Sequence, residues 1–147
     1  MFFAELTKYA LNKRYPDYKQ LAFKTATRRE ALKFLNRSQG DIRVVADIEA
    51  VRIEARRYAA AAKAVTPIDR AYLFGSYAKG TARKLSDVDI AFFFYGLSDE
   101  EIFKFQTRLI HMTLDFTGWF EPLAFSTSDL DTDNPFVSEI LRTGIEL

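Results

Sequence analysis

The stretch that decides the fold is "LFGSYAKGTARKLSDVDIAFFF", from Leu73 to Phe94. It starts with a short apolar run that ends at a Gly-Ser pair, continues through mostly polar residues and closes in an apolar, aromatic run. Two aspartates, Asp87 and Asp89, stand one residue apart at the head of that closing run. Apolar runs bounded by turn residues predict strands. The sequence therefore places two like charges where a strand suited to burial begins.

The composition of the 147-residue chain, 48% hydrophobic and 28% charged, is that of an ordinary globular domain. This balance excludes wholesale disorder, and the length suffices for a hydrophobic core. The absence of cysteine excludes disulfides, thiolate metal sites and cysteine nucleophiles. No apolar run approaches the length of a membrane span and the amino terminus lacks a signal-peptide pattern, so we expect a cytoplasmic protein with no membrane contact.

Charge is unevenly distributed along the chain. Residues 1–70 contain 15 lysines and arginines against 8 acids, whereas residues 71–147 contain 6 against 12. A basic half suits an anionic partner such as RNA or an acidic protein, and an acidic half suits cations. A solvated helical surface rich in lysine and arginine explains the basic half equally well.

Hydrophobic periodicity and turn signals predict the order of the elements. Helices are expected over 17–36, from 41 to about 65, from 98 to about 116 and from 134 to about 144. A short strand over 42–46 is an open alternative, and further strands are expected over 71–74, 88–95 and 119–125. This order predicts an α+β (α/β-like) fold, a small mixed sheet with flanking helices.

The aspartate pair favours a divalent cation. Side chains alternate along a strand, so Asp87 and Asp89 point to the same side. Two adjacent carboxylates repel each other, and burying them without compensation is costly. Oxygen ligands without cysteine or histidine favour Mg²⁺, or Mn²⁺ as a substitute, and Mg²⁺ commonly shares its shell with substrate phosphates. The pair therefore predicts a magnesium site that a phosphorylated substrate completes.

The residues upstream of the pair suit a phosphate. Gly75 and Ser76 follow a strand, where a backbone turn presents N–H groups to an anion and the serine hydroxyl adds a hydrogen bond. Lys79, Arg83 and Lys84 supply positive charge between this turn and the acid pair. The segment as a whole predicts a site for a nucleoside triphosphate with bound Mg²⁺.

Three other polar residues have simpler interpretations. Ser86 either turns the chain before the acid pair or contacts a phosphate. Tyr77 is expected to be exposed in the phosphate loop, where it is also a conceivable target of self-modification. His111, the single histidine, lies outside the apolar face of its predicted helix and is expected at the surface.

The spacing of these residues carries a family resemblance. Gly75-Ser76, ten intervening residues and Asp87-Val88-Asp89 resemble the GSx10DxD signature of the DNA polymerase β-like nucleotidyltransferase superfamily. The segment "LFGSYAKGTARKLSDVDI" is similar to the "LFGSxARGxxxxxSDxDL" motif of minimal nucleotidyltransferases, whose antitoxin members pair with HEPN-domain toxins.

The resemblance extends over about residues 47–147 and includes the ending "EILRTGIEL", which is similar to the final helix of the family. It implies a nucleotidyltransferase domain over 47–147 and an N-terminal helical extension over 1–46. Lys79 stands where the family usually has arginine, which keeps the charge but gives up the bidentate fork.

The resemblance also implies a third carboxylate on a later strand. Glu121 is the acid of the strand expected over 119–125, although the family more often has aspartate there. Pro122 directly after it is an unusual neighbour within a strand. Asp115, near the end of the preceding helix, is the alternative.

The implied activity is two-metal nucleotidyl transfer. Asp87, Asp89 and Glu121 would bind two Mg²⁺ ions and carry catalysis, and the triphosphate, most simply ATP, would lie on the residues that follow the first strand: Gly75, Ser76, Lys79, Arg83 and Ser86. The resemblance implies transfer of AMP to a hydroxyl of a partner protein, a tyrosine of a HEPN toxin, in an antitoxin role. The alternatives are transfer to an antibiotic or an RNA end, and a catalytically weak module that neutralises its partner by binding alone.

Overall fold

The computed structural model of the chain describes residues 48–83, 86–116, 119–131 and 134–147. The helix expected over 17–36, the alternative strand over 42–46 and the extension over 1–46 lie outside these residues. The helix expected from residue 41 is described from Ile48 onward.

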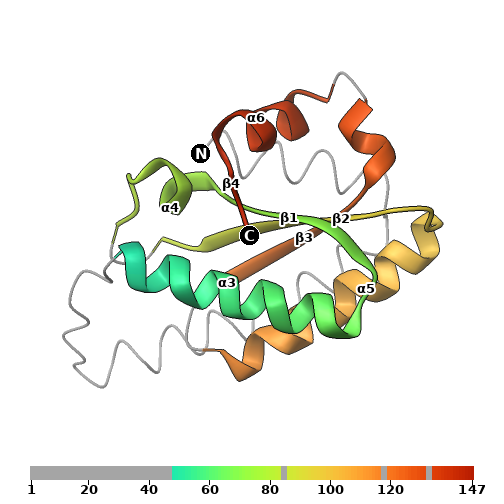
Figure 1. Cartoon of the computed structure of the whole chain (residues 1–147), viewed down its shortest axis with the longest axis horizontal. Coiled ribbons are helices and arrows are strands. Elements are labelled where there is room, and N and C mark those ends of the chain that lie inside the picture. The colour runs from blue at the N-terminus through green and yellow to red at the C-terminus, as the bar shows by residue number, and fades with distance from the viewer. Residues whose placement is uncertain (1–47, 84–85, 117–118, 132–133) are drawn as a thin grey trace. The chain divides into compact units, whose positions relative to one another are not determined.

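A four-stranded mixed sheet forms the centre of this part of the chain (Figure 1). Across the sheet the strands follow the order β3 (Phe120–Ser126), β2 (Val88–Phe94), β1 (Ile68–Phe74) and β4 (Ile145–Glu146). Strand β1 is antiparallel to both β2 and β4, whereas β2 and β3 are parallel. The predicted α+β fold with a small mixed sheet is confirmed.

Four α-helices accompany the sheet in the described residues: α3 (Ile48–Val65), α4 (Gly75–Lys79), α5 (Asp99–Met112) and α6 (Pro135–Thr143). Helices α3 and α5 run along one face of the sheet and α6 lies on the other (Figure 1). Helix α5 begins with a capping box, in which the backbone N–H of Ser98 donates to Glu101 over 2.9 Å and Glu101 donates its own N–H to the Ser98 hydroxyl. None of the described helices is long and apolar enough to span a membrane.

Strand β2 is buried on both faces, which explains its almost continuous apolar sequence. On one face, Phe92 makes an edge contact with Tyr58 of α3, and Phe94 stacks on Phe105 of α5. On the opposite face, Phe93 stacks on Phe125, which in turn contacts Phe136 of α6. Phe92, Phe93 and Phe94 are each 0% exposed, which confirms that the strand expected over 88–95 is suited to burial.

Several element boundaries differ from the prediction. Strand β1 starts at Ile68 rather than residue 71, and β3 covers 120–126 rather than 119–125. Helix α5 ends at Met112 and passes into a 3₁₀ turn over Thr113–Asp115, so the predicted continuation to 116 is wrong. Strand β4 was not expected; it pairs Ile145 with Leu73. Such a short strand has no period of its own, and tertiary pairing alone creates it.

Gln106 of α5 completes the outer edge of strand β3. Its side-chain N–H donates to the carbonyl oxygen of Pro122 (2.7 Å), and its carbonyl oxygen accepts the backbone N–H of Ala124 (2.6 Å). The amide is 3% exposed and takes the place that a neighbouring strand would otherwise occupy. Proline is tolerated at an edge because no partner strand requires its missing N–H. The edge position therefore accounts for Pro122 beside Glu121.

We predict that Gln106→Leu lowers the free energy of unfolding by about 2–4 kcal/mol, because it leaves two buried backbone groups of β3 without partners. The matched control is Lys104→Leu on the exposed side of the same helix, which should change stability by less than about 0.5 kcal/mol. Urea unfolding followed by circular dichroism measures both. Equal losses in the two variants would contradict the role assigned to the Gln106 amide.

Candidate functional site

Strand β1 passes directly into the short helix α4 at the predicted Gly75-Ser76 pair. Gly75 has a φ of 71°, a left-handed conformation that L side chains rarely adopt. The N-cap residue, Phe74, has no side-chain hydrogen bond to the start of the helix. The carbonyl oxygen of Ser76 accepts the backbone N–H groups of Gly80 and Thr81, which closes the helix after five residues. The predicted turn is thus the first turn of a short helix.

The pairing of the three central strands brings the candidate acids to one end of the sheet. Asp89 of β2 is the register partner of Glu121 on β3 and, on the other side, of Phe74 on β1. Because residues paired in register point to the same face, Asp89 and Glu121 share the face that α6 covers. Both side chains are partly exposed. Glu121 is therefore adjacent to Asp89 across a single pair of strands.

Gly75 lies in direct contact with the Asp89 side chain. A Cβ atom built on Gly75 would stand 2.3 Å from Asp89 Oδ2 and 3.1 Å from Asp89 Cγ. Both distances are shorter than van der Waals contact, so another side chain at this position would displace the carboxylate. Glycine is therefore required at residue 75 for its conformation and for its contact with Asp89.

Asp87 lies just before the first residue of β2 and is partly exposed. Burial raises the pKa of the Tyr77 phenol in α4, and the negative charge of Asp87 raises it further. The expectation that Tyr77 is exposed is wrong, since the residue is only 5% exposed. A phenol this buried is poorly placed for self-modification.

The turn before Asp87 employs Ser86 and Arg83. The Ser86 hydroxyl accepts the backbone N–H of Arg83 over 2.8 Å, and the Ser86 N–H donates back to the Arg83 carbonyl over 2.9 Å. These two bonds support the turn-forming interpretation of Ser86. The side chain of Arg83 is exposed.

Lys79 at the end of α4 forms an ion pair with Glu139 of α6, with its Nζ 2.7 Å from Glu139 Oε1. The amine that was expected to contact a phosphate thus has a protein carboxylate as a close neighbour. The expected charge is present, and its contact links two helices that lie 60 residues apart in the chain.

Arg52 of α3 is a site neighbour that the sequence did not indicate. Its Nη2 donates to the carbonyl oxygens of Tyr77 and Ala78, each over 3.2 Å. These carbonyls belong to the last turn of α4, where a cation is favoured by the unsatisfied acceptors and by the helix dipole. In the sequence Arg52 is one of many basic residues in a helix, and only tertiary contact distinguishes it.

Asp115, the alternative third carboxylate, and His111 both lie at the surface. Asp115 is exposed in the 3₁₀ turn after α5, whereas Glu121 is in register with Asp89. His111 is exposed near the end of α5, as expected.

The donor chemistry of the three carboxylates fits magnesium, because Asp87, Asp89 and Glu121 supply only oxygen ligands. The backbone register and the close contact of Gly75 with Asp89 also fit. The three side chains do not yet converge, because within the described ranges no three acidic or histidine side chains are grouped so that they could hold a metal ion. Side-chain rotation would be needed to bring the carboxylate oxygens of these three residues together.

A separate surface hollow lies at the opposite end of the sheet, where β2 and β3 finish and β1 begins. It is lined by residues that include Asp69, Tyr95 and Ser126. None of the predicted site residues contributes to it.

The comparison with family sequence models agrees with the motif. The sequence model of the family described as "Polymerase beta, Nucleotidyltransferase" matches residues 58–147, which include both the Gly75-Ser76 pair and the three acids. A crystal structure described as that of a "putative nucleotidyltransferase" from Sulfolobus solfataricus is similar with a TM-score of 0.49 and 20% identity, over 73% of this chain and 90% of the other. No curated protein matches the chain.

We predict that Gly75→Ala abolishes binding of a magnesium–nucleotide complex, because its methyl group displaces the Asp89 carboxylate. The matched control is Gly80→Ala, since Gly80 has nearly the same φ of 72° but no atom within 4 Å of an added Cβ. Both variants should lose roughly 1 kcal/mol of stability through backbone strain. Isothermal titration with Mg²⁺–ATP and thermal unfolding measure the two effects. Similar nucleotide affinities in the two variants would show that the contact with Asp89 is irrelevant to binding.

Proposed function

The chain belongs to the polymerase beta nucleotidyltransferase family, and on that premise we propose that it transfers a nucleoside monophosphate from a nucleoside triphosphate to a hydroxyl group of a partner protein. The observation that carries the proposal is the register of Asp89 with Glu121, next to the contact of Asp89 with Gly75. It brings the two parts of the signature and the later acid to one end of the sheet.

In the proposed reaction the acceptor oxygen attacks the α-phosphorus, a new P–O bond forms, and the bond to the β-phosphate oxygen breaks to release pyrophosphate. Asp87 and Asp89 would hold two Mg²⁺ ions, and Glu121 would orient the acceptor hydroxyl and accept its proton. Magnesium bound there would supply the positive charge that lowers the pKa of this hydroxyl and neutralises the departing pyrophosphate. Gly75 and Ser76 let the triphosphate approach the backbone where α4 begins.

The rigidity of β2 supports this assignment. Its aromatic residues are buried on both faces, so Asp89 emerges from a strand that packing holds in place. Nucleotidyl transfer depends chiefly on positioning and on charge neutralisation, since the protein contributes little covalent chemistry. A fixed strand carrying the acids is suited to that task.

We propose ATP as the donor and a tyrosine hydroxyl of a HEPN-type toxin as the acceptor, in an antitoxin role. The support is the similarity of residues 73–90 to the motif of minimal nucleotidyltransferases. A test is incubation of the protein with α-labelled ATP, Mg²⁺ and a HEPN protein encoded beside it. Label on a partner tyrosine supports this acceptor, and label on an RNA end or an aminoglycoside instead would replace it.

A second candidate is a binding module that neutralises its partner without catalysis. It is favoured by one observation: the acids in the described residues are not grouped to hold a metal ion. Under this alternative, the protein that carries both Asp87→Ala and Asp89→Ala would still neutralise the partner in cells as well as the unchanged protein does.

We predict that Glu121→Gln lowers the rate of nucleotidyl transfer by roughly 100-fold or more, while Mg²⁺–ATP affinity changes little, because Asp87 and Asp89 remain. Single-turnover transfer from labelled ATP measures the rate, and titration measures the affinity. The matched control is Asp115→Asn, which removes the exposed alternative acid and should leave the rate unchanged. If Asp115→Asn is impaired and Glu121→Gln is not, the third carboxylate is Asp115.

A further inference from the structure

Helix α4 is too short to hold its own orientation. It contains five residues, Gly75–Lys79, whereas isolated helices of fewer than about 12 residues are marginal in water. Its direction must therefore be set by contacts with other elements. This orientation matters because its first residue is the glycine packed against the Asp89 carboxylate.

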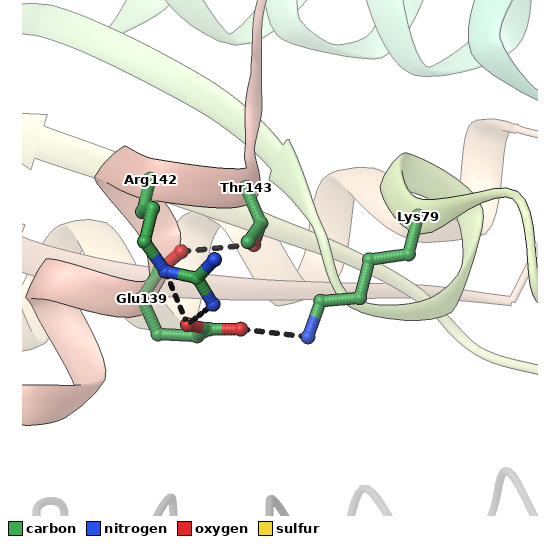
Figure 2. A network of polar contacts seen from close by, with 4 residues as sticks. All are labelled: Lys79, Glu139, Arg142 and Thr143. Carbon is green, nitrogen blue, oxygen red and sulfur yellow. Dashed lines mark hydrogen bonds and ion pairs between the residues drawn. The ribbon is translucent and has the colours of Figure 1, made fainter.

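On one side, α6 holds α4 through a shared carboxylate. Glu139 accepts from Lys79 over 2.7 Å through Oε1 and from Arg142 through Oε2 (Figure 2). The hydrogen bonds from Lys79, and then those from Arg142, hold the pKa of the Glu139 carboxyl below its usual value. The bonds from Arg142 stay within α6, whereas the bond from Lys79 joins α6 to α4.

On the other side, α3 holds α4 through Arg52. The guanidinium donates hydrogen bonds to the carbonyl oxygens of Tyr77 and Ala78, so it binds the backbone of the last turn rather than a side chain. Glu49 of α3 lies 3.8 Å from the same guanidinium, within ion-pair distance. The side chain of Arg52 is 25% exposed, and its contacts are consequently less screened by solvent than those of a surface ion pair.

We infer that Arg52 and Glu139 are positioning residues that clamp α4 between α3 and α6 and thereby keep Gly75 against Asp89. Their effect on nucleotide binding rests on the proposed function, whereas their effect on α4 does not. In this arrangement Lys79 contributes chiefly through Glu139. A lysine that instead bound a phosphate directly would gain from the loss of Glu139, because the competing carboxylate would be gone.

The structural part is tested by hydrogen exchange with mass spectrometry on the full chain. Glu139→Gln should raise the exchange rate of amides 75–81 about two- to five-fold, as expected for an ion pair of this exposure, and Arg52→Gln should raise it at least as much. The matched control is Arg142→Gln, which removes the other partner of Glu139 within α6 and should leave these amides unchanged. Circular dichroism verifies that each variant is folded. Unchanged exchange in both Glu139→Gln and Arg52→Gln, or an equal rise in Arg142→Gln, would overturn the clamp.

The functional part is tested by titrating the same variants with Mg²⁺–ATP, together with a charge exchange. The clamp predicts that Lys79→Glu alone weakens binding and that Lys79→Glu combined with Glu139→Lys restores it, since the exchanged pair again joins α4 to α6. Direct phosphate contact by Lys79 predicts no restoration in the double variant and tighter binding in Glu139→Gln, and either result overturns the positioning role. If the unchanged protein binds no nucleoside triphosphate, the proposed function fails, and the exchange rates still decide whether the clamp exists.

Discussion

The contact between the backbone of Gly75 and the carboxylate of Asp89 is the constraint from which the rest of the site follows. A Cβ at residue 75 would stand 2.3 Å from Asp89 Oδ2, so the residue that directly follows β1 must lack a side chain. The same residue turns the chain into α4 with a positive φ. One glycine thus joins the first strand, the short helix and the acid-bearing strand at a single point.

Most of the fold could be predicted because its signals are local. The buried strand that contains Phe92–Phe94 and the helix that begins after Ser98 depend on signals from neighbouring residues, and both are confirmed. Strand β4 could not be predicted, because its two residues become a strand only by pairing with β1. The position of Pro122 became clear only when Gln106 was seen to take the place of a partner strand.

The candidate site, like the fold, could be predicted only in part. The spacing from Gly75 to Asp89 can be recognised in the sequence, since both ends belong to one strand–helix–strand unit. The burial of Tyr77 and the contacts of Arg52 depend on how α3 packs against α4, and no periodic pattern encodes that packing. The partner of Lys79 lies 60 residues further along the chain. Contacts between elements could therefore not be predicted from the sequence, whereas most of the elements themselves could.

The central claim is that nucleotide and metal meet at the end of the sheet where Gly75, Asp89 and Glu121 lie. The most direct measurement is a crystal structure with Mn²⁺ and a non-hydrolysable ATP analogue, in which anomalous scattering locates the metal. We expect manganese bound by Asp87 and Asp89, with the triphosphate against Gly75 and Ser76. Nucleotide in the hollow beside Tyr95 at the opposite end of the sheet, or metal without any contact to Asp89, would contradict it.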